Sequence, residues 1–205
     1  GRTGLTMSEI GMGCEGLVGK SAEETRAFVD KMEEWGVNCL DLYTPDPEVR
    51  SNLGAALKGR REKFILQAHL WKDGQYKRTR EISEVKEGFA DQLRRLETDR
   101  VEIGMIHYVD SLKDWEEIQK GDVMGYALEL KAEGKIGCIG MSSHNPEAAL
   151  AAVNSGLVDI LMFSVNPCYD LLPANEDVEA LWDGKNYEKP LVNMDPQRQA
   201  LYETC

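Results

Sequence analysis

Short apolar runs alternate with amphipathic stretches along most of the chain. Six runs have the length and the Ile, Val and Leu content of strands that are buried on both faces. These candidate strands lie at 10–13, 38–43, 64–70, 101–109, 136–141 and 159–165. Most are followed by polar residues and then by apolar positions at helical spacing. The pattern predicts a repeated unit of strand, loop and helix.

Capping residues mark where several of the expected helices begin. Ser21 and Glu24 have capping-box spacing. Asp46, Asn145 and Asp195 each precede a proline, a pair typical of an N-cap followed by the first helical residue. The expected helices lie at 21–36, 46–59, 83–96, 123–131 and 145–156, and one more begins at 195.

Two connections are expected to be long, and the second is also irregular by composition. One holds Trp115, and the other runs from 169 to 192. A loop of the second length in a compact domain is usually functional or mobile.

The alternation of strands and helices leaves two fold classes, a (β/α)8 barrel and an open doubly wound sheet. The second usually carries G-x-G-x-x-G after its first strand, and the residues from Gly11 to Gly16 match that motif poorly. We therefore expect one α/β domain over residues 1–205, built as a TIM barrel of which the chain covers about six βα units.

The net charge of the chain disfavours two classes of binding partner. The 205 residues carry a net charge of −12, which disfavours nucleic acid and anionic membrane surfaces. No apolar run approaches the roughly 20 residues of a membrane span, and no signal peptide is visible. We expect no nucleic-acid and no membrane partner.

Five cysteines are scattered, without a Cys-x-x-Cys pair: Cys14, Cys39, Cys138, Cys168 and Cys205. Two of them lie inside expected strands, where a thiol fills space as a small apolar group. The odd number of cysteines favours a reducing compartment, and so we expect a cytoplasmic protein with structural thiols.

All three histidines fall near the carboxyl end of an expected strand, at His69, His107 and His144. One such histidine is more often structural than catalytic, but three on one rim of a barrel suggest a site. Asp41 interrupts an apolar strand, where an unpaired buried carboxylate would be costly. Tyr43 lies two residues further on and so faces the same side.

Six segments together resemble the aldo-keto reductase family over nearly the whole chain. They are GRTGL-x-x-S-x-IGMG, GVNCLDLY, PEVRSNLGAALKGRREKFIL, LRRLETDRVEIGMIH, LKAEGKIGCIGMSSHNPE and VDILMFSVNPCYD. The resemblance implies a (β/α)8 barrel that reduces a small-molecule carbonyl substrate with NADPH, usually without a metal ion.

Under this resemblance, Asp41 and His107 match the family's catalytic aspartate and histidine. The family's proton-donating tyrosine comes five residues after its aspartate, where this chain has Asp46. The family's lysine ends the third strand, where this chain has His69. We expect Tyr43 to act as the donor with His69 as its partner, although an imidazole would shift the pKa of a phenol less strongly than a lysine.

The resemblance also assigns cofactor contacts. Ser142 and Ser143 match the family's Ser-Asn pair, which holds the nicotinamide carboxamide, although the second residue differs. Ser164 or Asn166 falls near a glutamine with the same role. The basic loop from 72 to 80 could contact phosphate, but such charge more often faces solvent.

The family barrel has two more strands than this chain, and its contacts to the NADPH phosphates come from that part. We therefore expect a chain truncated before strands 7 and 8. The sequence also resembles a branch whose longer members add a C-terminal iron–sulfur segment, so a cluster is expected only in a part not present here.

Two other functions are compatible with the residues. A catalytically silent relative, acting as a partner or sensor subunit, is suggested by the changed tyrosine and lysine positions. A metal-dependent hydrolase would bind Zn²⁺ through Asp41, His69, His107 and His144, although His-x-His spacing and paired carboxylates are missing.

Overall fold

A curled parallel sheet forms the centre of the molecule. The computed structural model describes residues 2–71, 79–167, 169–172, 174–188 and 193–205. The six strands of this part pair in the order of the sequence, β1-β2-β3-β4-β5-β6, and every neighbouring pair is parallel. They are β1 (Gly11–Gly13), β2 (Cys39–Leu42), β3 (Ile65–Leu70), β4 (Val101–Ile106), β5 (Ile136–Ser143) and β6 (Ile160–Phe163).

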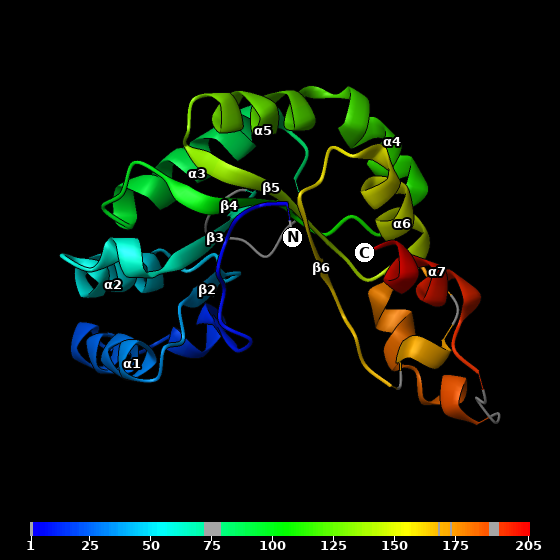
Figure 1. Cartoon of the computed structure of the whole chain (residues 1–205), viewed down its shortest axis with the longest axis horizontal. Coiled ribbons are helices and arrows are strands. Elements are labelled where there is room, and N and C mark those ends of the chain that lie inside the picture. Colours follow the sequence, from blue (N-terminus) through cyan, green and yellow to red (C-terminus); the bar gives the residue numbers. More distant parts are fainter. Residues whose placement is uncertain (1, 72–78, 168, 173, 189–192) are drawn as a thin grey trace.

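Seven α-helices accompany the sheet in the described part of the chain. They are α1 (Ala22–Glu34), α2 (Pro47–Leu57), α3 (Ile82–Arg95), α4 (Leu112–Lys120), α5 (Asp122–Ala132), α6 (Pro146–Ser155) and α7 (Pro196–Thr204). Figure 1 shows α1 to α6 along the outer side of the sheet, which is open between β1 and β6. The prediction of an α/β barrel fold of which this chain covers about six βα units is confirmed.

The predicted helix starts are confirmed by their caps. Ser21 and Glu24 form a complete capping box at α1. The side chains of Asp46, Asn145 and Asp195 accept backbone N–H groups in the first turns of α2, α6 and α7. Each of these caps satisfies donors that have no partner within the helix.

The long connection predicted around Trp115 is wrong, because this residue lies in α4. Ser111 caps that helix by accepting the N–H of Asp114, and Trp115 and Ile118 are its two buried residues. Leu112, Trp115 and Ile118 recur every three residues among charged ones, which is helical spacing, so the sequence does carry the signal for this helix. The strand predicted for 101–109 is also too long, since β4 ends at Ile106 and Tyr108 has a φ of 56°.

The segment from 169 to 192 holds three short 3₁₀ helices in its described part: η3 (Tyr169–Leu171), η4 (Val178–Trp182) and η5 (Gly184–Tyr187). The basic loop, whose charge was expected to face solvent rather than phosphate, lies mostly on residues 72–78, outside the described residues, as does Cys168.

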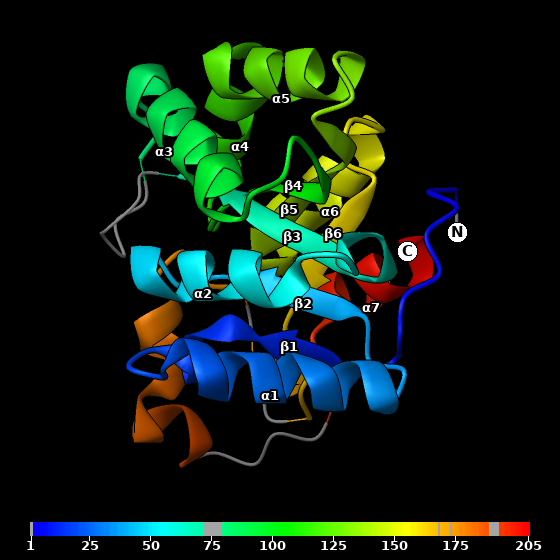
Figure 2. The same ribbon diagram turned by 90° about the vertical axis from the view of Figure 1, so that its left-hand side faces the viewer.

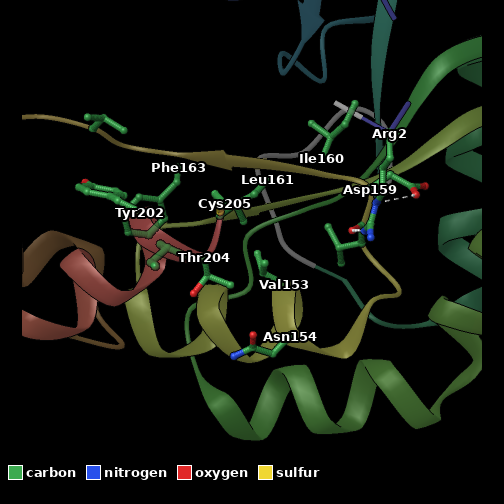
Figure 3. A pocket seen from close by; sticks show the side chains of 13 residues that line it. Arg2, Val153, Asn154, Asp159, Ile160, Leu161, Phe163, Tyr202, Thr204 and Cys205 are labelled. Atoms are coloured by element: carbon green, nitrogen blue, oxygen red, sulfur yellow. Dashed lines mark hydrogen bonds and ion pairs between the residues drawn. The ribbon is translucent and has the colours of Figure 1, made fainter. Parts of the chain in front are cut away.

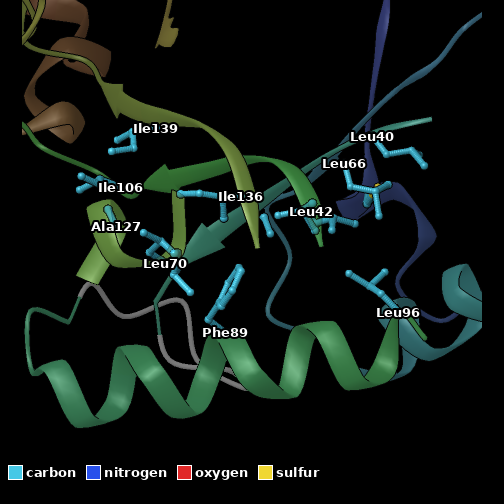
Figure 4. Close-up of a cluster of buried hydrophobic side chains, with 14 of the residues drawn as sticks. Leu40, Leu42, Leu66, Leu70, Phe89, Leu96, Ile106, Ala127, Ile136 and Ile139 are labelled. Carbon is cyan, nitrogen blue, oxygen red and sulfur yellow. The ribbon is translucent and has the colours of Figure 1, made fainter. Parts of the chain in front are cut away.

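Alternation along the strands separates a helix-covered face from an inner face. Leu40 and Leu42 of β2 are fully buried in the layer beneath the helices. Figure 4 shows Phe89 of α3, and Leu96 directly after that helix, in the same cluster of buried side chains. Burying each such side chain contributes about 1.5–3 kcal/mol. Asp41 lies between the two leucines and therefore faces the inside of the curl, where its register partner on β3 is Gln67. Figure 2 shows α1 and α2 side by side over this part of the sheet.

Candidate functional site

A cavity of about 260 Å³ lies where the strands end. Its walls come from the carboxyl ends of β2 to β6 and from the C-terminal segment. The lining residues are Tyr43, His69, His107, Tyr108, Ser142, Ser143, His144, Met162, Ser164 and Trp182. Most of the residues predicted from strand ends therefore meet at one place, which is where barrels of this architecture carry chemistry.

A line of hydrogen bonds joins Asp41, His69 and His107. His69 Nε2 lies 2.9 Å from Asp41 Oδ1, and His69 Nδ1 lies 2.9 Å from His107 Nδ1. Gln67 Nε2 donates to the same carboxylate oxygen at 2.8 Å. Because a carboxylate only accepts, the Nε2 atom of His69 carries a proton. The exposed fractions of His69 and His107 are 1% and 6%, so the two histidines are buried, whereas the side chain of Asp41 is 23% exposed.

Aromatic rings surround these two histidines. The Tyr43 ring centre lies 5.9 Å from that of His69 and 5.7 Å from that of His107. Trp71 lies 4.4 Å from His107, measured in the same way. Tyr43 thus stands in the same wall as the two imidazoles, although it comes directly after β2 rather than within it.

Arg80 fixes the loop that carries His107, a contact that the sequence pattern did not predict. Its guanidinium donates to the carbonyl oxygens of His107 at 2.9 Å and Tyr108 at 3.1 Å. The same group pairs with both carboxylate oxygens of Asp114, at 3.0 and 2.7 Å. Bidentate pairs of this kind have a defined geometry, so Arg80 ties the loops after β3 and β4 to the first turn of α4.

His144 lines the same cavity with a different partner. Its Nδ1 atom lies 2.9 Å from Oδ2 of Asp110, and its backbone N–H donates to Oδ1 at 2.6 Å. The Asp110 side chain is 1% exposed and that of His144 is 30% exposed. Sequence periodicity did not single out Asp110, because it lies beyond the end of β4.

The four residues considered from the sequence as zinc ligands form two separate sets of hydrogen bonds. Asp41 and His107 already take up both ring nitrogens of His69, while His144 belongs to Asp110. Within the described residues, no group of three or more His, Cys, Asp or Glu side chains is arranged to hold a metal ion.

Three of the four residues predicted to contact the cofactor line the cavity. The Ser142 hydroxyl accepts the N–H of Tyr108 at 2.8 Å, and the Ser143 hydroxyl lies 3.3 Å from Asp110 Oδ1. Ser164 lines the cavity at the end of β6. Asn166 is exposed, and the cavity wall does not include it.

Asp46 has a structural task at the position where the resemblance expects tyrosine. Its carboxylate accepts the N–H groups of Glu48 at 2.8 Å and Val49 at 3.4 Å, which caps α2. It does not line the cavity.

The cysteines of the described part are unpaired, and three of them are buried: Cys14, Cys39 and Cys138. Burial raises the pKa of each of these three thiols, and the negative charge of Asp41 adds to the effect at Cys14 and Cys39. A raised pKa keeps a thiol protonated and unreactive, as expected for structural cysteines.

A second and larger cavity, of about 710 Å³, follows the outer side of β6 (Figure 3). Its wall includes Ile160, Leu161 and Phe163, together with residues of α6 and α7. Arg2 and Asp159 lie together at one end. It holds none of the residues predicted for the site.

Helices of the described part are all too short or too polar to cross a membrane.

Similarity to known proteins agrees with this architecture. Aldo-keto reductase YhdN of Bacillus subtilis (strain 168) is 29% identical over 164 residues, which cover 71% of this chain and 46% of that protein. The holo form of aldo-keto reductase AKR11C1 from Bacillus halodurans is 27% identical with a TM-score of 0.61, over 79% of this chain and 53% of that one. An aldo-keto reductase structure from Pseudomonas aeruginosa is 26% identical with a TM-score of 0.70, over 82% of this chain and 66% of that one.

A structure of an aldo-keto reductase from Klebsiella pneumoniae in complex with NADPH shares the fold at 20% identity, with a TM-score of 0.52. This chain spans about half the length of the curated relative and of several of these structures. The sequence model of the aldo/keto reductase family matches residues 9–198, nearly the whole chain. The chain therefore belongs to the aldo/keto reductase family.

Proposed function

We propose that this chain is part of an oxidoreductase that transfers a hydride between NADP(H) and a small carbonyl or alcohol substrate. The observation that carries the proposal is the hydrogen-bonded line from Asp41 through His69 to His107, which ends at the cavity beside Tyr43. Membership of the family and a related fold in complex with NADPH support it.

The residues at the ends of β5 and β6 fit the nicotinamide end of such a cofactor. Ser142, Ser143 and Ser164 are small and polar, and the rings of Tyr108 and Trp182 offer flat surfaces in the same cavity. These serines would hold the carboxamide, and Asn166 lies further along the segment that Ser164 begins after β6. When bound, the cofactor supplies or accepts the hydride.

The altered catalytic set has a physical division of tasks. Asp41 holds His69 in one tautomer, and His69 holds the ring of His107. Since neutral His69 carries its proton on Nε2, its Nδ1 accepts from the Nδ1–H of His107, and Nε2 of His107 is left without a hydrogen to donate. Tyr43 would then donate to the substrate oxygen, which gains negative charge as the hydride arrives. Donors placed in a site with little water stabilise such charge strongly.

Two measurements test this function, and both use the complete protein, with any βα units that follow the 205 residues. Calorimetry should detect NADPH binding, and NADPH oxidation should follow the addition of small aldehydes or ketones. Binding of NADPH without turnover on any such substrate would contradict the proposal.

A catalytically silent relative is the second candidate, and one observation favours it. Asp46 caps α2 at the position of the family's tyrosine, and His69 replaces its lysine. A silent partner or sensor subunit would bind the cofactor or a protein without oxidising NADPH. A metal-dependent hydrolase would instead show stoichiometric zinc in purified protein.

We also propose that further βα units complete the barrel. The support is the coverage of 46% to 66% of the relatives described above, together with a sheet that is open at β6. An intact-mass measurement on protein from its natural source tests this. The iron–sulfur cluster and the cytoplasmic location stay predictions, and iron and acid-labile sulfide assays test the first.

A further inference from the structure

Asp110 and His144 form a carboxylate–imidazole pair in the wall of the cavity, apart from the line that begins at Asp41. The carboxylate of Asp110 is almost fully buried, and one of its oxygens, Oδ2, accepts from His144 Nδ1 at 2.9 Å. Its other oxygen accepts the backbone N–H of His144 at 2.6 Å and lies 3.3 Å from the Ser143 hydroxyl. Three hydrogen bonds therefore hold the carboxylate in place.

This arrangement decides which nitrogen of His144 exchanges a proton. An ionised carboxylate has no hydrogen to donate, so Nδ1 of His144 must carry the proton of their hydrogen bond. The remaining nitrogen, Nε2, is then the one that can release or take up a proton. An imidazole oriented by a buried carboxylate is the arrangement that general acid–base catalysis uses.

Exposure distinguishes His144 from the other two histidines. The side chain of His144 is 30% exposed, whereas His69 and His107 are 1% and 6% exposed. A group that gives up a proton in every turnover must regain it from water. His144 has that access while it also lines the cavity.

We propose that His144, held by Asp110, is the acid that protonates the substrate oxygen in this cavity. The proposal rests on the function proposed above, and it leaves Tyr43 as a hydrogen-bond donor to the same oxygen. In this proposal His144 takes over the proton donation that the resemblance assigns to a tyrosine at position 46, where this chain has Asp46.

The step balances in atoms and electrons. In the reducing direction, a C–H bond of the dihydronicotinamide breaks with its electron pair and a C–H bond forms at the carbonyl carbon. The π pair of the carbonyl becomes a lone pair on oxygen, which takes the proton from His144 Nε2. The imidazolium becomes neutral with its remaining proton on Nδ1, and solvent restores the lost one.

The first test needs neither cofactor nor turnover. In the full chain labelled with ¹⁵N-histidine, neutral His144 should be mainly the Nδ1–H tautomer. Asp110→Asn should raise the Nε2–H population, because an amide has one accepting oxygen and its NH₂ group donates. Asp91→Asn is the matched control, since Asp91 is a carboxylate on α3 that pairs with Arg94 and Arg95. This variant should leave the tautomer population of His144 unchanged. A wild-type His144 that is mainly Nε2–H overturns the proposal.

The second test measures turnover in variants whose circular dichroism matches the wild type. His144→Asn should lower kcat by about 10²-fold or more, with a much smaller change in KM for NADPH. Added imidazole should restore turnover to His144→Ala but not to Tyr43→Phe.

The outcomes separate the two proposals. Suppose that the wild type turns over. Full kcat in His144→Asn would then overturn the role of His144 alone, and so would a His144→Ala variant whose turnover imidazole does not restore. A wild-type protein without turnover overturns the proposed function, while the tautomer measurement still decides whether the pair exists.

Discussion

The Nδ1 atoms of His69 and His107 lie 2.9 Å apart, so the two imidazoles share one hydrogen bond inside the wall of the cavity. Only one of the two atoms can carry the proton of that bond, and His69 is already tied to Asp41 through Nε2. The orientation of His107 in the cavity wall therefore depends on a residue that lies behind it.

Replacing His69 should thus affect both stability and turnover. His69→Leu leaves Asp41 and His107 without this partner in a buried wall, and we expect a loss of about 1–3 kcal/mol in the free energy of unfolding. Urea denaturation measures it. His69→Gln, which keeps a donor and an acceptor, should lose less, and equal losses in the two variants would contradict the shared-bond explanation.

Tyr43→Phe should reduce turnover while the protein stays folded. The ring packs against His69 and Trp71, and phenylalanine keeps that packing. Loss of one hydrogen-bond donor to a developing oxyanion lowers kcat by about 10²–10³-fold in well-studied sites. Steady-state kinetics measure it, and full turnover in this variant would remove Tyr43 from the mechanism.

Arg80→Gln should loosen the loop after β4. The variant removes the bonds to the carbonyl oxygens of His107 and Tyr108 and the bidentate pair with Asp114. We expect a loss of about 1–3 kcal/mol in stability and a lower kcat, measured by denaturation and steady-state kinetics. Arg94→Gln is a suitable control, since Arg94 is an exposed arginine paired with Asp91 on α3 and such pairs contribute about 0–1 kcal/mol. Similar losses in both variants would contradict a special role for Arg80.

The fold could be predicted from the sequence because its signals are local. Asp46, Asn145 and Asp195 cap their helices through contacts two or three residues away, so a dipeptide with proline is enough to predict each start. The helix α4 lacks such a dipeptide, but the spacing of Leu112, Trp115 and Ile118 behind its Ser111 cap is a local signal that could have predicted it.

The candidate site was predictable only on the strands and directly after them. Asp41 and His69 stand out as polar residues in apolar runs, and parallel strands bring their carboxyl ends together. Asp110 and Arg80 lie in loops, and their contacts depend on how the chain turns at Tyr108, whose φ is 56°. Periodicity carries no information about such a turn, and therefore these two partners could not be found from the sequence.

The ionisation of Asp159 should make the free energy of unfolding depend on pH. Burial acts to raise the pKa of its carboxyl, but hydrogen bonds from Lys131 and from the backbone of Ile139 outweigh burial and lower it. A lowered pKa in the folded state gives stability that is present at neutral pH and is lost as the pH falls through that pKa. Asp159→Asn should therefore be less stable than the wild type at pH 7, with a difference that shrinks in acid. Denaturation curves at several pH values measure it, and a constant difference would contradict this explanation.

Thiol labelling should follow burial. Burial raises the pKa of Cys14 and of Cys39, whereas Cys205 is exposed at the end of α7. We expect iodoacetamide to modify Cys205 within minutes under conditions where Cys14 and Cys39 react only after unfolding. Peptide mass spectrometry measures the order, and early modification of Cys14 would contradict its placement in the core.

The cap on α2 also limits which residues position 46 can accept. The carboxylate of Asp46 accepts two backbone N–H groups of the helix that follows. A tyrosine in its place would bring a phenol and at once remove the cap, at a cost of about 1 kcal/mol. A redesign that adds a phenol at this position therefore needs a second substitution to restore the lost stability.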